Sequence, residues 1–256
     1  MGAEPPRRVR RELERRRAGA GNFELIDTHA HLDDAAFDGD RDEVMARARA
    51  AGVDGFIVPG VRAAGWARLR DLSRQHGWRF AVGTHPHALV HGREVPTDIE
   101  GACAIGECGL DGGVPVDMDE QARVLDAHLG LARDARLPVI LHCWRAHDRL
   151  PPLLRRHGTV RGVLHSYSGG PDLVDVYVRL GLHLSFAGAV TRPGARKPIE
   201  ALRRVPAQRI LVETDAPDQG PGPGRNEPRF LVDVATAVSR VRPDADLDAN
   251  ARALFG

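Results

Sequence analysis

An Asp-x-His-x-His run, Asp27 to His31, follows the short apolar stretch Phe23–Ile26 near the start of the chain. Side chains in a β-strand alternate faces with a period of two, so Asp27, His29 and His31 are expected to point the same way. Two neighbouring imidazoles at a strand end form half of a divalent-metal site, and the carboxylate can ligate the metal or orient the rings. The run therefore predicts metal binding, with an exposed loop that happens to carry histidines as the alternative.

Residues that bind metals or transfer protons also come at the ends of the other apolar segments: His85, Glu107, His142, His165 and Glu213–Asp215. Imidazoles and carboxylates without thiolates favour Zn, Mn, Fe, Ni or Mg in an open site over a closed structural zinc site, which usually contains cysteine. The candidate ligands outnumber the four that one tetrahedral ion needs, so we expect two divalent ions that share a carboxylate. These ligands are His29, His31, Glu107, His142, His165 and Asp215.

Glu107 and Asp215 are the expected catalytic residues. Some hydrolytic barrels bridge two metals with a carboxylated lysine on the fourth strand, but the only lysine here, Lys197, falls in an expected helix after the seventh strand. Glu107 is therefore predicted to bridge the ions, with a solvated loop glutamate as the alternative. Asp215 is expected to ligate one ion and to accept the proton of the attacking water.

The elements that must position these residues are short apolar segments, each bounded by turn residues and followed by a polar stretch with helical spacing. They predict eight strands, over Phe23–Asp27, Gly55–Val58, Phe80–Gly83, Ala102–Glu107, Pro138–His142, Gly162–His165, His183–Phe186 and Ile210–Glu213. The alternation favours a (β/α)8 TIM barrel in the α/β class, with a doubly wound open sheet as the alternative. A barrel would close the strand ends into a ring and bring the candidate ligands into one pocket.

Helices are expected between the strands, over Asp40–Ala51, Ala63–His76, Met118–Arg136, His147–His157, Pro171–Leu180, Pro193–Val205 and Pro228–Val241. The gap from His91 to Gly101 is so short that the third helix must be stunted or missing. A terminal helix, Leu247–Phe255, is expected to pack outside the barrel. Three histidines in the helical segments, His76, His128 and His157, are expected to face solvent.

Length and composition are compatible with a single domain over residues 23–256, because 256 residues with 42% hydrophobic content can form one large core. The net charge of +1 creates no overall field for nucleic acid or membrane, so a polyanion would have to be bound locally. No apolar run approaches the roughly 18 to 20 residues of a membrane span, and no secretory signal is visible, so a soluble cytoplasmic protein is expected. Residues 1–22 are rich in arginine and are expected to be disordered, with a nucleic-acid-binding arm as the alternative.

Taken together, these motifs resemble the TatD family of metal-dependent hydrolases. The similarity runs in order from about residue 24 to the end of the chain. It rests on Asp27–His31, Gly83–Pro86, Gly106–Asp111, Leu137–His142, His165–Gly169, Leu211–Pro217, Arg225–Pro228 and Asn250–Gly256.

The resemblance implies a TIM barrel with two divalent metals that hydrolyses phosphodiester bonds, often as a 3′-to-5′ exonuclease on DNA. The expected substrate is single-stranded DNA, and no obligate protein partner is implied. One ion would be held by His29, His31, Glu107 and Asp215, and the second by Glu107, His142 and His165. Further substrate contacts are expected from His85, facing the scissile phosphate, and from Arg145, Arg225 and Asn226.

The sequence departs from the family pattern at Trp144. The fifth-strand motif usually has an arginine two residues beyond its histidine, but here that place is Trp144 and the arginine, Arg145, comes one residue later. The displacement weakens the case for a preformed phosphate clamp, because the bidentate geometry of arginine is what such a clamp uses. Hydrolysis of a carboxylic ester, lactone or amide at the same ions remains an alternative, as does a barrel that has lost catalysis and acts as a binding module.

Overall fold

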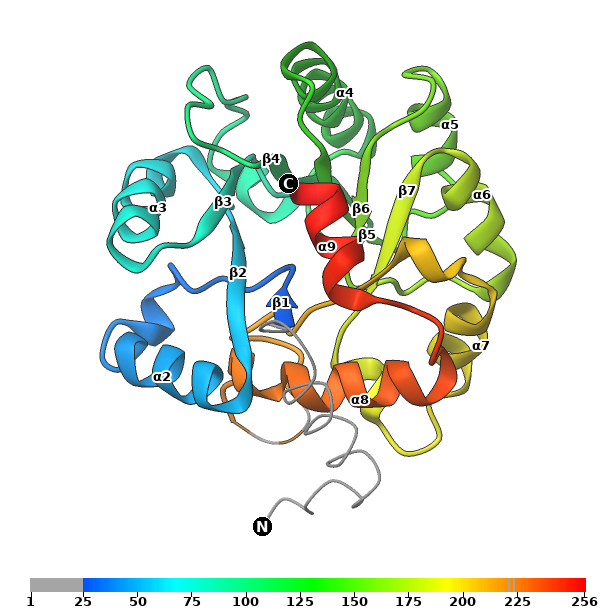
Figure 1. Cartoon of the computed structure of the whole chain (residues 1–256). Coiled ribbons are helices and arrows are strands. Elements are labelled where there is room, and N and C mark those ends of the chain that lie inside the picture. The colour runs from blue at the N-terminus through cyan, green and yellow to red at the C-terminus, as the bar shows by residue number, and fades with distance from the viewer. Residues whose placement is uncertain (1–24, 221, 223) are drawn as a thin grey trace.

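The computed structural model describes residues 25–256 except 221 and 223, so the arginine-rich segment 1–22 lies outside the described residues. Eight parallel strands follow one another around a single sheet in the order β1 to β8, and the predicted barrel is confirmed (Figure 1). The strands are β1 Leu25–Asp27, β2 Val53–Pro59, β3 Arg79–Val82, β4 Ala104–Asp111, β5 Val139–Trp144, β6 Gly162–Leu164, β7 Leu182–Phe186 and β8 Ile210–Val212.

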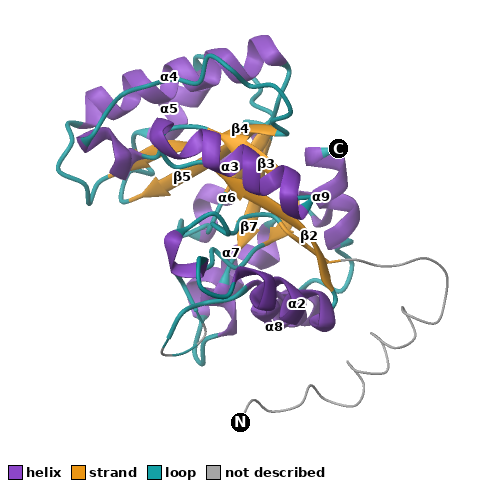
Figure 2. Cartoon of the chain, turned by 90° about the vertical axis from the view of Figure 1, so that its left-hand side faces the viewer, coloured by secondary structure: helices purple, strands orange, loops and turns teal. Residues whose placement is uncertain are grey.

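Helices surround the strands, and Figure 2 shows the strands enclosed between helices on both sides. The α-helices are α2 Arg41–Ala51, α3 Ala63–His76, α4 Met118–Ala135, α5 Leu150–Arg155, α6 Val174–Arg179, α7 Arg196–Arg204, α8 Leu231–Val241 and α9 Leu247–Phe255. Between β3 and β4 the described chain forms only the 3-10 turn Pro86–Val90 in place of a helix, as the short gap predicts.

Prolines explain why several helices begin later than expected. The segment from His147 becomes helical only at Leu150, which places Pro151 and Pro152 in the first turn of α5. Proline is tolerated there because the first-turn N–H groups have no partner within the helix, whereas further along it would break the hydrogen-bond ladder. The helix expected from Pro193 likewise begins at Arg196 in α7.

Strand β4 is longer than expected, extending to Asp111 instead of ending at Glu107. The glycines in this segment resemble a turn in the sequence, but they allow β4 to lie very close to β5. A Cβ on Gly109 would meet the carbonyl oxygen of His142 at 2.0 Å. The extension pairs Asp111 with Trp144 and carries both strands beyond Glu107 towards the cavity.

Hydrogen bonds between the segments after β8 and β1 close the barrel. The Thr28 amide donates to the Val212 carbonyl at 3.2 Å, and the Asp215 amide donates to the His29 carbonyl at 2.9 Å. Asp27 reinforces this seam by accepting hydrogen bonds from the amide of Thr214 at 3.0 Å and from its hydroxyl at 2.5 Å. The first and the last histidine- and carboxylate-bearing segments are therefore side by side.

Helix α9 covers the N-terminal ends of the strands, and Figure 1 shows it lying across the ring. Its residues Ala251, Leu254 and Phe255 pack against a cluster from the barrel interior that includes Ile57 and Ile140. The helix lies outside the barrel, as expected, and its position there is against the N-terminal ends of the strands. Apolar side chains therefore close this end of the barrel, and the candidate ligands lie at the opposite end.

We predict that Gly83→Ala destabilises the fold by about 1–3 kcal/mol, since the added methyl overpacks the barrel. Its Cβ would meet backbone atoms of Gly106 at 2.5 and 2.6 Å, and backbone cannot move aside as a flexible side chain can. Urea denaturation measures the change. Gly130→Ala within α4 is the matched control, because its Cβ meets nothing within 4 Å and alanine favours the helix. Equal stability of Gly83→Ala and the parent protein would contradict the packing argument.

Candidate metal centre

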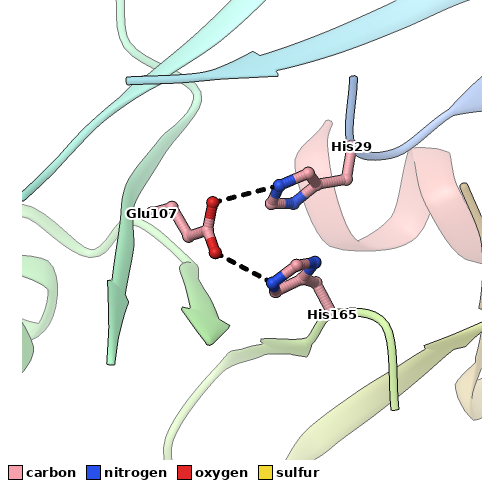
Figure 3. A group of neighbouring side chains, drawn as sticks. All are labelled: His29, Glu107 and His165. Atoms are coloured by element: carbon pink, nitrogen blue, oxygen red, sulfur yellow. Dashed lines mark ion pairs between the residues drawn. The ribbon is translucent and has the colours of Figure 1, made fainter. Parts of the chain in front are cut away.

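The structure brings all six predicted ligands to the C-terminal end of the barrel. Figure 3 shows His29 and His165 directed at opposite oxygens of the Glu107 carboxylate. The ligands come from the segments at the ends of five strands, β1, β4, β5, β6 and β8, so no single element could assemble them. The six residues are His29, His31, Glu107, His142, His165 and Asp215.

One group of ligand atoms surrounds Oε2 of Glu107. This oxygen lies 3.1 Å from His29 Nε2 and 3.5 Å from His31 Nε2. The two imidazole nitrogens are 3.2 Å apart. Oδ1 of Asp215 lies 3.5 Å from the first nitrogen and 3.6 Å from the second. Four ligand atoms from three separate segments therefore meet around one point.

A second group surrounds the other oxygen of the same carboxylate. Oε1 of Glu107 lies 3.1 Å from His142 Nδ1 and 2.8 Å from His165 Nε2. These two nitrogens are 3.2 Å apart. His85 Nε2 also approaches this oxygen, at 3.2 Å. The two oxygens of Glu107 thus face two different ligand groups.

These spacings fit divalent cations. Two ligands about 2.1 Å from a tetrahedral ion lie roughly 3.4 Å from each other. The observed separations of 2.8 to 3.6 Å within the groups bracket this value. The donor set of nitrogen and carboxylate oxygen also suits the metals that the sequence favours.

Charge interactions determine the protonation of the centre. Glu107 is buried, which by itself raises its pKa, but the neighbouring imidazoles of His165, His85 and His29 outweigh burial and hold the pKa well below its usual value. Burial lowers the pKa of His165, yet Glu107 and Glu213 outweigh this effect and hold that pKa well above its usual value. In the absence of a bound cation, the protonated ring of His165 therefore neutralises the buried carboxylate of Glu107.

His29 differs from His165 although their rings are stacked, with centroids 4.0 Å apart. Burial and the charge of His165 lower the pKa of His29. Its ring is therefore neutral and its lone pair can bind a cation. The Nδ1 atoms of His29 and His31 have no hydrogen-bond partner among the described residues.

Two further carboxylates orient the imidazoles of the second group. Glu213 accepts from the Ser166 amide at 2.6 Å and lies 3.2 Å from Nδ1 of His165, which turns Nε2 of that ring towards Glu107. Asp111 lies 3.0 Å from Nε2 of His142 and turns its Nδ1 to the same place. Such partners of ligating histidines fix the tautomer and the ring orientation.

Asp111 is a residue that the sequence analysis missed. Burial raises its pKa, but hydrogen bonds from His142 and Gly113 outweigh this effect and lower the pKa to about 2. The signal was present, because Asp111 lies four residues beyond Glu107 and the period of two places both on one face of a strand. It was overlooked because the strand was expected to end at Glu107.

The segment after β8 orients Asp215 through its neighbours. Asp215 has a left-handed backbone with φ of 59°, which is unusual for a residue other than glycine and marks a constrained position. Gln219 donates a side-chain hydrogen bond to Oδ2 of Asp215, and Ser166 donates to Gln219 Oε1 at 2.9 Å. Oδ1 is left to face the histidines. No local pattern in the sequence points to Gln219 or Ser166 in this role.

Asp27 does not join the ligand group, which corrects the expectation that it points the same way as His29 and His31. Strand β1 ends at Asp27, so alternation does not continue through the histidines. The carboxyl group instead bonds to Thr214, and burial raises its pKa to about 8 against the lowering effect of those bonds. Asp27 supports the barrel seam beneath the centre.

The predicted substrate-binding residues lie in different places. His85 lines the cavity above the centre, whereas Arg145, Arg225 and Asn226 are not among the residues that line it. The side chain of Arg225 bonds to Asp40 at 2.7 and 2.6 Å. Asn226 is buried and donates to the carbonyl of Thr214 at 2.7 Å, so it braces the loop after β8.

A cavity of about 1260 Å³ opens over the centre. Seven carboxylates and four cationic side chains line it, the latter being Arg62, Arg68, Arg192 and Lys197. Arg68 is paired with Asp38, and Lys197 donates to the carbonyl of Ser168 at 2.7 Å. Arg62 and Arg192 form no ion pair with any described residue. Sequence analysis did not single out these two arginines, because nothing local distinguishes them from other exposed arginines.

The expectation that His76, His128 and His157 face solvent is wrong. His128 is completely buried, and its Nε2 accepts from the Thr84 amide at 3.1 Å, next to His85. It lies on the buried face of α4 with Val124 and Ala132, a helical spacing that the sequence already shows. The side chains of His76 and His157 are only 10% and 11% exposed.

The comparisons with known proteins agree with this geometry. The family described as TatD related DNase matches residues 26–255. The uncharacterized metal-dependent hydrolase YjjV of Escherichia coli K12 is 37% identical over 206 residues, which cover 76% of this chain and 80% of YjjV. The 3′-5′ ssDNA/RNA exonuclease TatD of a Pantoea species is 35% identical over 258 residues, covering 90% of this chain and 99% of that protein.

Solved structures give the same result. The crystal structure of Escherichia coli YjjV superimposes with a TM-score of 0.81 at 32% identity, covering 90% of this chain and 94% of YjjV. A TatD family hydrolase of Entamoeba histolytica has a TM-score of 0.78 at 18% identity, which supports the fold alone. No helix in the described part of the chain is long and apolar enough to span a membrane. The chain belongs to the TatD-related DNase family and is a metal-dependent hydrolase built on a (β/α)8 barrel.

Proposed function

We propose that this protein is a two-metal phosphodiesterase that removes nucleotides from the 3′ end of single-stranded DNA. The observation that carries the proposal is the position of Glu107, whose two carboxylate oxygens face two separate ligand groups. Phosphodiester hydrolysis commonly uses two ions about 3.5–4 Å apart, one near the attacking and one near the leaving oxygen. A single bridging carboxylate is suited to hold ions at that spacing. The exonuclease name of the Pantoea relative supports the choice of substrate.

Each of the two ligand groups would hold one cation. His29, His31, Asp215 and Oε2 of Glu107 would hold one cation, while Oε1 of Glu107, His142 and His165 would hold the other. When bound, the cations would lower the pKa of water from about 15.7 towards 7 and offset the charge that develops on the phosphate.

Asp215 and His85 are placed to act on the reactants. Asp215 borders the cavity and can accept the proton of the attacking water while Gln219 fixes its orientation. Burial lowers the pKa of His85, so the ring is neutral at pH 7 and carries one N–H. Nδ1 accepts from the His87 amide at 3.1 Å, so this N–H is on Nε2, 3.2 Å from Oε1 of Glu107. With a cation on that oxygen, the N–H would be available to a phosphate oxygen in the cavity.

The charge of the cavity makes DNA binding depend on the cations. The seven lining carboxylates outnumber the four positive side chains and would repel a polyanion, whereas two divalent cations reverse that balance. Arg62 and Arg192, which have no ion-pair partner among the described residues, are available for the phosphates of a bound strand.

The same surplus of carboxylates favours a second candidate, hydrolysis of an uncharged ester, lactone or amide at the same cations. The deciding experiment measures the metal content of the purified protein and then digestion of 3′- and 5′-labelled single-stranded DNA with Mg²⁺, Mn²⁺ or Zn²⁺. An EDTA-treated sample is the control. Release of mononucleotides from the 3′ end supports the proposal. Hydrolysis of an ester, lactone or amide panel without any DNA cleavage would replace it by the second candidate.

We expect Glu107→Gln to lower kcat on single-stranded DNA by about 10³-fold or more, because the bridging charge is lost. The bound metal, measured by mass spectrometry, should fall from two ions to one or none. Asp218→Asn is the matched control, because Asp218 lines the same cavity but belongs to neither ligand group, and it should keep both metals and near-normal activity. Two retained metals in Glu107→Gln would show that Glu107 does not bridge them.

We also expect cation binding to release protons and to weaken as the pH falls. The raised pKa of His165 means that this ring is protonated at neutral pH in the metal-free protein, and a cation must displace that proton. Calorimetric titration of metal-free protein at pH 7, in two buffers with different ionisation enthalpies, should give different heats that correspond to release of at least one proton, since the pKa of His142 is raised as well. Heats independent of the buffer would contradict the protonated state of His165.

A further inference from the structure

One large apolar side chain is exposed at the mouth of the metal centre. Trp144 is 46% exposed and lines the cavity, whereas Val90, which is 52% exposed, does not. No other large apolar side chain is exposed among the residues that the structure describes. An indole left in water beside a candidate active site is a surface that a ligand can cover.

The strand framework holds Trp144 beside the reacting centre. It is the last residue of β5, two residues beyond His142, so both side chains lie on one face of the strand, about 6.6 Å apart along it. The carbonyl of Trp144 accepts from the Gly112 amide at 2.8 Å, which keeps the strand paired to this point. The indole is therefore carried by paired strand backbone.

The surroundings of the indole are open and polar. Gly113 offers no side chain against the ring, where a Cβ would lie 3.7 Å from Cδ1 of Trp144. The guanidinium carbon of Arg145 lies 5.7 Å from the ring centroid, and Arg145 itself does not line the cavity. Because Arg145 lies over the ring, a planar group entering from the cavity would stack on the indole face that Arg145 does not cover.

Seven carboxylates in the cavity wall leave little net positive charge for a nucleic acid even when two divalent cations join the four basic side chains. The exposed indole of Trp144 adds an aromatic surface to the cavity wall, and its contribution to binding does not depend on this charge balance. Proteins that bind single strands without sequence preference use aromatic side chains in this way, since every base has a face that can stack.

We propose that Trp144 stacks against a nucleobase of the single-stranded substrate and positions the nucleotide next to the scissile phosphate. The proposal rests on the nuclease function proposed above and specifies how the substrate is held. Trp144 is a binding residue and contributes no proton transfer.

The first test separates binding from chemistry. Trp144→Ala should raise KM for single-stranded DNA about tenfold, the effect of losing one stacked base, and change kcat less than twofold. Trp144→Phe should restore most of the affinity because the ring is kept. Val90→Ala is the matched control, as an exposed apolar residue outside the cavity, and should leave KM unchanged.

The second test asks whether the partner of Trp144 is a base. Oligonucleotides carry one abasic site at the first, second or third position from the 3′ end. At one position, loss of the base should raise KM of the wild-type protein about tenfold but leave KM of Trp144→Ala unchanged, because the stacking partner is already missing. Trp144→Arg should be equally insensitive to the abasic site and should show a steeper dependence on salt, as expected for a phosphate contact.

A third measurement needs no turnover. A phosphorothioate oligonucleotide added to the metal-loaded protein should quench tryptophan fluorescence, and the quenching should disappear in Trp144→Phe. The other two tryptophans, Trp66 and Trp78, do not line the cavity.

The outcomes distinguish the two proposals. If wild-type protein digests single-stranded DNA but Trp144→Ala keeps its KM and its sensitivity to the abasic site, stacking is wrong and the nuclease function stands. If wild-type protein with each metal neither digests DNA nor shows quenching, both proposals fall.

Discussion

The whole site depends on one constraint, the carboxylate of Glu107 that is buried at the mouth of the barrel. Glu107 is almost completely buried, and an isolated charge in such surroundings would be strongly unfavourable. The fold stabilises it with imidazoles from four other segments, led by His29 and His165 on its two oxygens. The same requirement makes the position attractive to cations, because a divalent ion satisfies the carboxylate while its histidines stay neutral. Electrostatic compensation and metal affinity are thus two aspects of one arrangement.

The barrel provides this compensation by its closure and by the length of its fourth and fifth strands. The seam between the ends of β8 and β1 places Asp215 against the first two histidines. The extension of β4 to Asp111 supplies the group that turns His142 towards Glu107. His142 and His165 are therefore oriented by carboxylates from other strands, Asp111 and Glu213, and the precision of this half of the site is a property of the assembled ring.

Sequence alone predicted the barrel, and it singled out six candidate ligands that the structure brings together. It could do so because strand periodicity and the proline and glycine residues that bound the strands are local features of the sequence. It did not predict what depends on contacts between distant segments. Gln219 acquires its role only because the loop after β8 folds back over Asp215. Arg225 and Asn226 lie within a family motif, which gives their place along the chain but not the direction of their side chains. In the structure, Arg225 bonds to Asp40 and Asn226 bonds to the Thr214 carbonyl, so both stabilise loops.

The seam of the barrel also has a consequence for biosynthesis. Asp27 and Thr214, whose contact lies beneath the centre, are 187 residues apart in the chain. A ribosome releases the two histidines next to Asp27 long before it makes Asp215. A growing polypeptide therefore contains every residue of the second ligand group before Asp215 is made, and the group around Oε2 of Glu107 is completed last. Complete cation binding, and any hydrolysis that depends on it, is therefore delayed until Asp215 has been translated.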